Sequence, residues 1–344
     1  FIGLGLIGGS LAKGIKKARP DIRIMAYMRT RSKLEQAKKD GIVDVILDGI
    51  DEQLKQCDLI FLCTPVEYNA QYLSKIRSYL KPGALITDVG STKTDIHKEI
   101  LRQGLTDCFV GGHPMAGSEK TGYENATDHL LENAYYIVTP PEGFNQNNSG
   151  YGDISPKYSE NVKRIIAVAQ TVGAIPLVLD YKEHDTVVAA ISHLPHLVAS
   201  SLVNLVKDSD SPAETMKQVA AGGFKDITRI ASSSPEMWEQ ICMTNAEPIA
   251  DMLERYIDSL QDILSEIKGH QGNAIYKLFE KSRDYRNTIT DRAKGSVEPS
   301  YAFSVDMADE VGAISTIAVI LAAKGISIKN IGINNNRERG EGTL

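Results

Sequence analysis

The stretch that decides the fold lies at the start of the chain and reads FIGLGLIGGSLAKGIKKA, residues 1–18. Gly3, Gly5 and Gly8 form a GxGxxG pattern, and a helix-like run follows them. Glycines at these positions permit a tight turn from a strand into a helix. They also let the backbone approach a pyrophosphate, which then lies on the helix N-terminus. Only a short apolar remnant precedes the loop, so we expect the first strand to begin before residue 1. The residues predicted to bind the cofactor phosphates are Gly3, Gly5, Leu6, Ile7 and Gly8.

A GxGxxG pattern alone is also compatible with an ordinary glycine-rich turn. The following residues favour the dinucleotide interpretation, because apolar strand-like runs alternate with helical runs such as residues 69–80. The strand-like runs are residues 21–28, 58–65, 84–91, 108–114 and 134–140. This alternation predicts an α/β domain with a doubly wound parallel sheet of the Rossmann type.

Polar residues follow several of these strands, at the edge of the sheet where such folds bind ligands. Thr64 and Pro65 follow one strand, Ser91 follows the next, and His113 ends a third within GGHPMAGSE, residues 111–119. We predict that Thr64, Pro65 and Ser91 contact the cofactor. His113 is then on the cofactor side of the sheet, which favours a role in chemistry over a role in the core.

The end of the second strand lacks the acid that usually binds the adenosine ribose. Met28 stands there, followed by Arg29, Thr30 and Arg31. Two arginines without a carboxylate suit a 2′-phosphate better than a free hydroxyl, so we predict that Arg29 and Thr30 bind this end of the cofactor. NADP is then used at least as well as NAD. The alternative is that both arginines are solvated surface charges.

The composition is that of a globular protein with two or three domains: 344 residues, 42% hydrophobic and 24% charged. The net charge of -6 argues against a nucleic-acid or anionic-membrane partner. The four cysteines form no CxxC pair, which favours the reducing cytoplasm over secretion. No apolar run approaches the roughly 20 residues that span a bilayer, and no signal peptide is visible.

Long helices with few glycines follow residues 172–180, which form a last predicted strand. The run 181–206 contains His184, and also His193 and His196, which share a helix face on either side of a kinking Pro195. These histidines are either satisfied core residues or part of a substrate pocket. A metal site with Glu183 or Asp185 is a third interpretation, but no third ligand stands at a convincing spacing, so we expect no metal.

Two further features of this half point to a substrate and to a partner. Lys225 and Arg229 are four residues apart, and on a helix they would present one cationic face to a carboxylate-bearing substrate. The alternative is an ordinary pair of surface charges. The helix expected over residues 245–267 has an apolar stripe that is too long to remain exposed to solvent. We therefore predict that it forms a homodimer interface. The stripe consists of Ile249, Leu253, Tyr256, Leu260, Leu264 and Ile267.

Taken in order, the motifs GLGLIGGS, DVGSTK, GGHPMAGSE, HD…SHLPH and GGFKDITRIA…SPEMW resemble the prephenate dehydrogenase family of tyrosine biosynthesis, over roughly residues 1–295. The resemblance implies oxidative decarboxylation of prephenate, with hydride transfer to NAD or NADP. It implies that His113 hydrogen-bonds the ring hydroxyl and helps remove its proton, and that Arg229 clamps a carboxylate. Met28 departs from the usual pattern and puts the NAD preference in question.

The same resemblance assigns the remaining candidate residues. Ser91 becomes a partner of the nicotinamide or of His113. The other substrate-binding candidates are His193 and His196 in the pocket, Glu119 near its mouth, and Lys225 beside the carboxylate clamp. Two other functions stay open: an arogenate dehydrogenase, and a non-catalytic sensor of nucleotides and amino acids. A catalytic base has no use in a sensor, which speaks against the latter.

The tail reads YAFSVDMADEVGAISTIAVILAAKGISIKNIGINNN, residues 301–336, and resembles the first βαβ half of an ACT regulatory domain. We expect a strand at 304–307, a helix that begins at Gly312 and stops at Gly325, and a second strand at 326–333. The resemblance implies L-tyrosine as ligand and feedback inhibitor; the alternative is a structural extension. The predicted domains are 1–180 for the dinucleotide, 181–298 for substrate and dimerisation, and 299–344 as an incomplete ACT-like domain.

Overall fold

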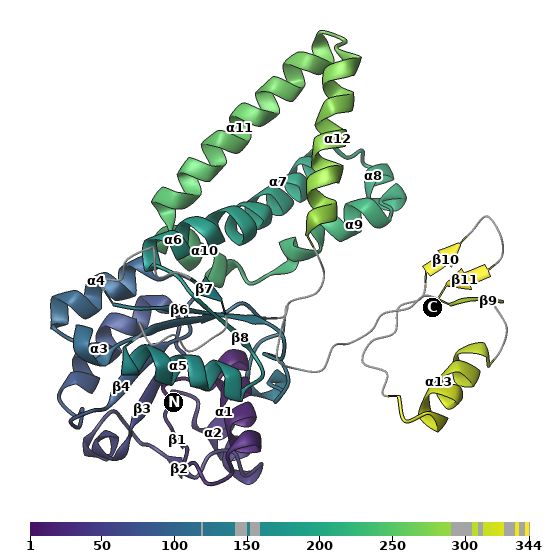
Figure 1. Cartoon of the computed structure of the whole chain (residues 1–344). Helices are drawn as coiled ribbons and strands as arrows, with labels where there is room; N and C mark the ends of the chain where they lie inside the picture. The colour runs from purple at the N-terminus through teal and green to yellow at the C-terminus, as the bar shows by residue number, and fades with distance from the viewer. Residues whose placement is uncertain are drawn as a thin grey trace. The chain divides into compact units, whose positions relative to one another are not determined.

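A computed structural model describes residues 1–117, 120–141, 150–151, 159–289, 305–308, 312–326, 334–336 and 341–343. The chain forms two compact units, Phe1–Ser296 and Val297–Leu344 (Figure 1). The larger unit contains the sheet, its covering helices and a group of long helices.

The glycine loop joins the first strand residues to helix α1 (Leu6–Ala18). Ile2 forms parallel bridges with Tyr27 and with Leu62, so it lies between two strands of the sheet. Gly3 has φ +88°, and a Cβ built on it would meet the carbonyl oxygen of Cys63 at 2.5 Å. Only glycine tolerates both conditions at little cost, and the predicted strand-turn-helix is confirmed.

Parallel strands form the first part of the sheet. β1 (Met25–Ala26) pairs with β2 (Val45–Ile46), and β3 (Leu59–Leu62) pairs with β4 (Leu85–Asp88). A bridge between Ile86 and Phe109 continues the sheet toward β5. This half is the Rossmann-type arrangement that the sequence predicts.

The second part of the sheet is mixed, which corrects the prediction of a purely parallel one. β5 (Gly111–Pro114) runs antiparallel to β6 (Tyr135–Thr139), because the described residues between them form only the short 3-10 helix η4 (Tyr123–Asn125). A parallel return needs a longer crossover, usually a full helix. β6 then pairs in parallel with β8 (Ile175–Val178), and β7 (Gly150–Tyr151) closes the edge antiparallel to β8.

Helices cover both faces of this sheet, as alternate residues of the strands require. On β3, Phe61 packs with α1 and α5 (Glu160–Thr171), whereas its neighbours Ile60 and Leu62 pack on the opposite side. That opposite side is covered by α3 (Asn69–Arg77) and α4 (Thr94–Gln103). The short α2 (Arg31–Lys39) covers the β1 end.

The helical part begins with one interrupted helix. α6 (Tyr181–Val188) runs into a π-helical turn, η6 (Ala189–His193), and then into α7 (Leu194–Ser209). Pro195 stands at the start of α7 and lacks an N–H. A π turn bonds each carbonyl to the N–H five residues on, which avoids the missing donor. The irregularity expected at Pro195 is therefore a π turn directly before it.

By length and composition alone, the run Tyr181–Ser209 would qualify as a membrane span. This corrects the expectation that no such segment exists. The run also carries buried His184, Asp185 and His193, which a lipid-exposed helix would have to desolvate without partners.

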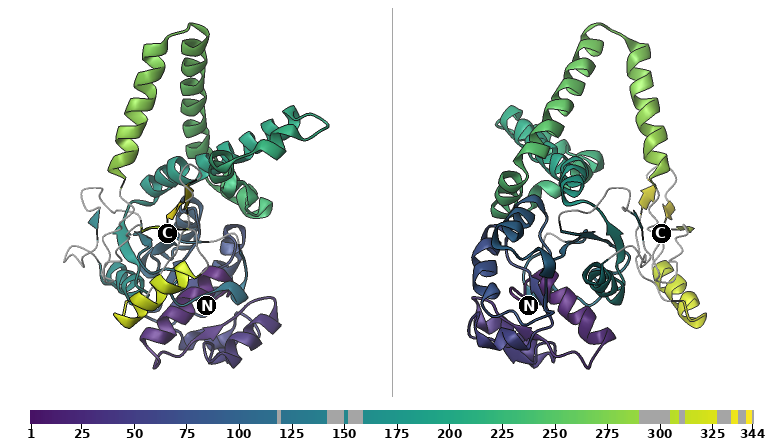
Figure 2. Two further views of the ribbon diagram at one scale, coloured as in Figure 1. Left: turned by 90° about the vertical axis from the view of Figure 1, so that its right-hand side faces the viewer. Right: turned by 60° about the vertical axis from the view of Figure 1, so that its left-hand side comes forward.

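Shorter helices follow: α8 (Thr215–Val219), α9 (Gly222–Thr228), η7 (Arg229–Ser232) and α10 (Pro235–Thr244). Ser234 caps α10 and Pro235 opens it, as such a sequence predicts. The long helices α11 (Ala246–Lys268) and α12 (Gly272–Thr288) form an antiparallel hairpin that stands out from the sheet in each view (Figure 2).

The smaller unit contains helix α13 (Ala313–Ala323) and three short strands, β9 (Asp306–Ala308), β10 (Asn334–Asn336) and β11 (Glu341–Thr343). Gly312 begins the helix with φ +94° and Gly325 follows it with φ +69°. β11 pairs antiparallel with both β9 and β10. Most of the second strand expected at 326–333 lies outside the described residues.

Candidate active site

The glycine loop has room for a pyrophosphate. A Cβ built on Gly5 meets nothing within 4 Å, whereas one on Gly8 would meet the carbonyl oxygen of Gly3 at 2.8 Å. Gly5 is the N-cap of α1, and no side chain there accepts a hydrogen bond from the first N–H groups, which belong to Leu6 and Ile7. Free N–H groups under an open surface suit an anionic ligand, so these residues fit a dinucleotide.

The adenosine end of such a cofactor would meet the β1–α2 loop. The Arg29 guanidinium lies over the Tyr68 ring at 5.2 Å, and Thr30 is the N-cap of α2 with no side-chain cap bond. Arg31 forms ion pairs with Asp48 and with Glu35. Of the two arginines expected to face a 2′-phosphate, Arg31 is therefore already engaged by carboxylates.

Two more predicted cofactor residues follow β3. Thr64 shares a hydrogen bond at 3.2 Å with Asn69, between Thr64 Oγ1 and Asn69 Oδ1, and Pro65 precedes the short helix η2 (Val66–Tyr68). Both lie directly after the carboxyl end of a strand that neighbours the glycine loop. This is the edge at which such sheets bind nucleotides.

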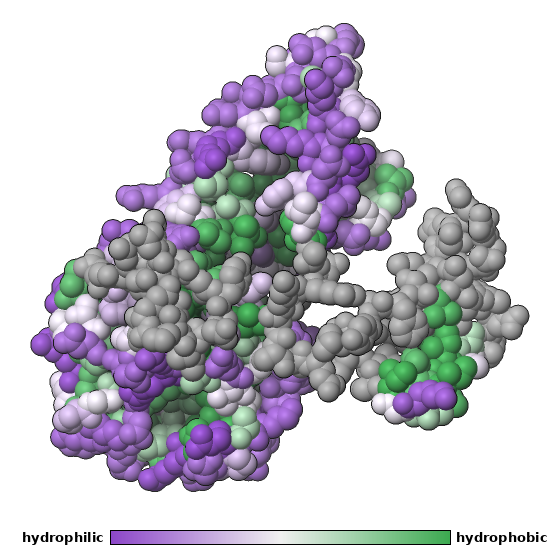
Figure 3. All heavy atoms as spheres, in the orientation of Figure 1, coloured by the Kyte–Doolittle hydropathy of each residue, from purple (hydrophilic) through white to green (hydrophobic). Residues whose placement is uncertain are grey.

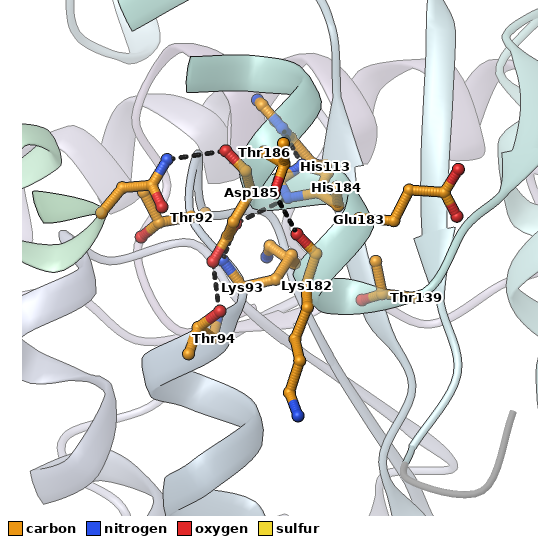
Figure 4. Close-up of polar contacts among 12 residues, drawn as sticks. Thr92, Lys93, Thr94, His113, Thr139, Lys182, Glu183, His184, Asp185 and Thr186 are labelled. Atoms are coloured by element: carbon orange, nitrogen blue, oxygen red, sulfur yellow. Dashed lines mark hydrogen bonds and ion pairs between the residues drawn. The ribbon is translucent and has the colours of Figure 1, made fainter. Parts of the chain in front are cut away.

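His113 lies in β5 and meets a second histidine from the helical part. Its Nδ1 is 2.8 Å from Nε2 of His184, and Nδ1 of His184 is 2.8 Å from Oδ1 of Asp185. His184 and Asp185 are adjacent on α6 and both are fully buried. Figure 4 shows the three side chains in one line, with Lys93 and Thr94 beside the carboxylate.

The Asp185 carboxylate is held from the other side by backbone. It accepts the N–H of Lys93 at 2.8 Å and the N–H of Thr94 at 2.7 Å, at the start of α4. A helix N-terminus stabilises an anion. These bonds also join the two halves of the larger unit, because α4 covers the sheet and α6 opens the helical part.

A buried ion pair supports the strand that carries His113. The Lys93 ammonium pairs with Asp88 at the end of β4 and donates to the carbonyl of Gly112 at 2.8 Å. Asp88 also accepts the N–H of Gly90 at 2.9 Å and the N–H of Gly112 at 3.2 Å. The residue before His113 is thus fixed through both its N–H and its carbonyl.

The electrostatics keep the histidines neutral. Burial lowers the pKa of His113 well below its usual range, and the neighbouring His184, Lys93 and His193 lower it further. Burial also lowers the pKa of His184, although Asp185 opposes this. For Asp185, burial acts to raise the pKa, but the contacts with His184 and Thr94 outweigh it and the pKa is lowered.

The pocket histidines predicted from the sequence are close to this line. Asn245 donates its side-chain N–H to the carbonyl of Asp185 at 2.9 Å and lies 3.1 Å from Nδ1 of His193. Burial lowers the pKa of His193 to about 4. His196 stacks on Trp238 with ring centroids 3.8 Å apart, and His193 meets the edge of the same indole.

The other predicted site residues take different places. Arg229 begins η7, and its charge lowers the pKa of His196 after the larger effect of burial. Lys225 is exposed on α9. Ser91 lies partly exposed on the loop between β4 and α4, and its hydroxyl has no hydrogen bond within the described ranges. Glu119 lies outside the described residues.

The sequence does not predict several residues of this arrangement. Among the site residues it misses are Lys93, Thr94 and Asn245, and it offers Asp185 only as a possible metal ligand. The one available signal was the adjacency of His184 and Asp185. Across the residues that the structure describes, no three His, Cys, Asp or Glu side chains gather in a way that could hold a metal ion.

Comparison with known proteins identifies two family matches. The family described as "Prephenate dehydrogenase, nucleotide-binding domain" matches residues 11–149, and "Prephenate dehydrogenase, dimerization domain" matches residues 180–281. Prephenate dehydrogenase of Bacillus subtilis (strain 168) is 38% identical over 346 residues, which cover 99% of this chain and 89% of the relative. The same enzyme of Lactococcus lactis subsp. cremoris (strain MG1363) is 35% identical, covering 100% and 91%.

Solved structures agree with these matches. The crystal structure of prephenate dehydrogenase from Aquifex aeolicus, in complex with hydroxyphenyl propionate and NAD+, superposes with a TM-score of 0.75 at 29% identity, covering 84% of this chain and 96% of that chain. The crystal structure of Synechocystis arogenate dehydrogenase superposes with a TM-score of 0.71 at 28% identity, and the match covers 83% of this chain and 98% of that chain. The predictions of a nucleotide-binding domain, a following helical domain and a nicotinamide cofactor are confirmed. The chain belongs to the prephenate dehydrogenase family, and it is an NAD(P)-dependent dehydrogenase.

Proposed function

We propose that this protein converts prephenate into 4-hydroxyphenylpyruvate and carbon dioxide, in L-tyrosine biosynthesis in the cytoplasm. The observation that carries the proposal is His113: a neutral imidazole at a strand end, on the nucleotide side of the sheet. The relatives from Bacillus subtilis and Lactococcus lactis, of which this chain covers 89% and 91%, are both named prephenate dehydrogenase. All four cysteines are unpaired, which suits a reducing compartment.

The reaction balances with one base and no net release of a proton. The ring C–H bond breaks and its electron pair leaves as hydride; NAD(P), when bound, accepts it. The hydroxyl proton on the same carbon passes to His113, and the bond to the ring carboxylate breaks to release carbon dioxide. That electron pair makes the ring aromatic, and His113 returns its proton to the phenolate oxygen. A base whose imidazole is neutral at working pH suits both transfers.

The remaining candidates provide binding and orientation. Arg229 offers a fork of donors that matches a carboxylate, and Lys225 adds positive charge on the preceding helix turn. His193 and His196 line the pocket with Trp238. Ser91 orients the nicotinamide or His113. Glu119, which lies outside the described residues, is the acid that the family resemblance assigns to the region near the pocket mouth.

The proposal is tested by following reduced nicotinamide after mixing the protein with prephenate and NAD. His113→Asn should lower kcat about 10²- to 10⁴-fold with little change in KM. Arg229→Ala should instead raise the KM for prephenate, because it removes binding shared by substrate and transition state. A wild-type kcat in His113→Asn would remove the base assignment.

A second candidate substrate is arogenate, which has an amine where prephenate has its keto group. The similarity to the Synechocystis arogenate dehydrogenase favours testing it. Turnover of the two substrates side by side separates these functions. No reduction of either cofactor with either substrate would leave the non-catalytic sensor.

We also propose that the protein is a homodimer formed through its helical part, for which the matched family description provides support. Large apolar side chains are exposed along the α11–α12 hairpin, including Leu264 (50%) and Phe279 (67%). Figure 3 shows hydrophobic side chains gathered between these helices and over α7. An open hollow of about 580 Å³ on α12 is lined by Tyr276, Phe279 and Arg283 among others. Exposed apolar surface of this extent is typical of an interface.

The proposed role of the tail is regulation by L-tyrosine through an ACT-like domain. Helix α13 begins at Gly312, where no side chain among the described residues caps the helix, and N–H groups at a helix start can receive the carboxylate of an amino acid. The smaller unit of the chain carries this helix separately from the unit with the site.

A further inference from the structure

The line from His113 through His184 to Asp185 has a direction that the hydrogen-bonding rules determine. An ionised carboxylate only accepts, so Nδ1 of His184 must donate its proton to Asp185. A neutral imidazole has one N–H, so Nε2 of His184 is then an acceptor. That atom lies 2.8 Å from Nδ1 of His113, which must therefore carry the proton of the His113 ring.

We propose that Asp185 and His184 are positioning residues that hold the His113 proton on Nδ1 and leave the lone pair of Nε2 free to act as the base. The inference rests on the proposed function, since it names the atom that receives the substrate proton. It goes beyond the assignment of His113 as a base, which does not say which nitrogen reacts or what keeps it unprotonated.

The surroundings of the pair make this arrangement rigid. Both side chains are fully buried on α6, and the carboxylate is bound by the N–H groups of Lys93 and Thr94. Asn245 holds the carbonyl of Asp185. A carboxylate that already accepts two backbone N–H groups cannot rotate away from His184 without losing them. Therefore Asp185 acts on His113 through His184 alone.

The same line stabilises the proton after its transfer. When the substrate O–H bond breaks, the proton binds Nε2 of His113 and the ring becomes an imidazolium. Its Nδ1–H continues to donate to His184, whose neutral ring is polarised by Asp185. The other groups that face His113 are His193 from η6 and Lys93 from the loop before α4. Lys93 is paired with Asp88, which leaves Asp185 as the anion that stands behind the imidazolium.

Asp185→Asn is the sharpest test, because an amide can replace the carboxylate without a change of shape. The N–H of Lys93 and Nδ1 of His184 share Oδ1, whereas the N–H of Thr94 binds Oδ2. An amide whose NH₂ takes the place of Oδ1 donates to His184, so the proton of His184 moves to Nε2, that of His113 moves to its own Nε2, and the base is blocked. An amide turned the other way keeps the tautomer, and in both orientations the anion behind the imidazolium is lost. We expect kcat to fall about 100-fold or more, with little change in the KM for NAD.

The tautomer is read directly by ¹⁵N NMR of the His113 ring in the absence of substrate. The wild type should carry the proton on Nδ1, and Asp185→Asn should carry it on Nε2 in the molecules whose amide NH₂ replaces Oδ1. His184→Gln should retain the Nδ1 proton, because the amide oxygen can accept it, and should lose less activity than Asp185→Asn. Asp185→Glu should recover part of the activity. Asp44→Asn is the matched control: Asp44 also accepts a backbone N–H, from Ile24 at 2.7 Å, but lies outside the site.

The inference would be overturned if the His113 ring of the wild type were protonated on Nε2. It would also be overturned if Asp185→Asn had the wild-type kcat, with the fall of kcat at low pH occurring at the same pH as in the wild type. The wild-type spectrum and His184→Gln keep it testable where Asp185→Asn does not fold. The spectra need no turnover, so an Nδ1 proton in a protein that oxidises neither prephenate nor arogenate would reject the proposed function and leave the positioning of His113 intact.

Discussion

Lys93 and Asp88 form an ion pair in which neither side chain has any exposed surface. The pair ties the end of β4 to the carbonyl of Gly112, one residue before His113. Burial lowers the pKa of Lys93, although Asp88 opposes this. A carboxylate left here without its ammonium would be a buried, uncompensated charge.

Lys93→Met should therefore lower the free energy of unfolding by about 3–5 kcal/mol, as measured by urea denaturation. Adding Asp88→Asn should recover part of the loss, because the stranded charge is removed. Lys55→Met serves as a control, since its pair with Glu52 is exposed and should contribute about 1 kcal/mol or less. A loss for Lys93→Met no larger than the control would show that Asp88 reaches water.

The cofactor preference should respond to the partners of Arg31. Asp48→Asn removes the carboxylate that pairs with Nη1 of Arg31, so that this end of the guanidinium can bind a 2′-phosphate while Nε stays paired with Glu35. A charge-assisted hydrogen bond contributes about 1.5–3 kcal/mol, so the ratio of kcat/KM for NADP to that for NAD should rise about tenfold. Lys55→Met provides a variant outside the cofactor loop. An unchanged ratio would mean that Arg31 does not reach the ribose and that NADP use depends on Arg29.

Stability should fall as the pH drops from 7 to 5, in part because of His97. This ring is buried between Phe109 and Tyr181 and shares a hydrogen bond at 2.9 Å with Thr139. Burial lowers the pKa of His97 from 6.5 to about 3. Below pH 6.5 the unfolded chain therefore binds a proton that the native state does not bind. The linkage contributes about 2 kcal/mol over these two pH units.

His97→Gln lacks that proton uptake, so its stability should depend on pH less steeply by about the same amount. Urea denaturation at both pH values measures the difference. His193 contributes in the same direction, with a pKa of about 4, and keeps some dependence in the variant. Parallel curves for wild type and His97→Gln would mean that His97 is protonated in the native state.

Dimerisation should depend on the exposed apolar side chains of α12. Phe279 is 67% exposed in the single chain, and Phe279→Asp should shift the protein toward a monomer because it places a charge in an apolar interface. Light scattering at micromolar concentration measures the mass. Lys277→Asp, an exposed position on the same helix, should stay dimeric. An active wild-type monomer would reject the dimer.

Inhibition by L-tyrosine should require the tail. Truncation after residue 298 removes α13 with the smaller unit, and the proposed regulation predicts full activity without inhibition. Allosteric coupling is typically 1–3 kcal/mol, or about 5- to 150-fold in affinity. Equal inhibition of the truncated enzyme would mean that tyrosine competes at the active site.

The parts of this protein that depend on neighbouring residues could be predicted from the sequence. The turn at Gly3 and the strand end at His113 each follow from a short local pattern. The antiparallel return of β6 could not be predicted, because strand direction depends on how the connection packs. The contact of Asp185 with the N–H of Lys93 joins residues 92 positions apart, and no pattern along the chain records it. The pairing of Arg31 with Asp48 is hidden for the same reason.

The π turn at η6 means that the helix from α6 to α7 contains one residue more than a regular helix would need. The turn absorbs that residue locally, so the side chains of α7 keep the rotational phase that a plain α-helix running on from α6 would give them. Deleting Ala190 would let the hydrogen bonds close as in a plain α-helix, in which the carbonyl of Ile191 faces the missing N–H of Pro195. The extra residue thus lets this helix carry a proline, and its deletion should lower stability while His196 stays on the face toward Trp238.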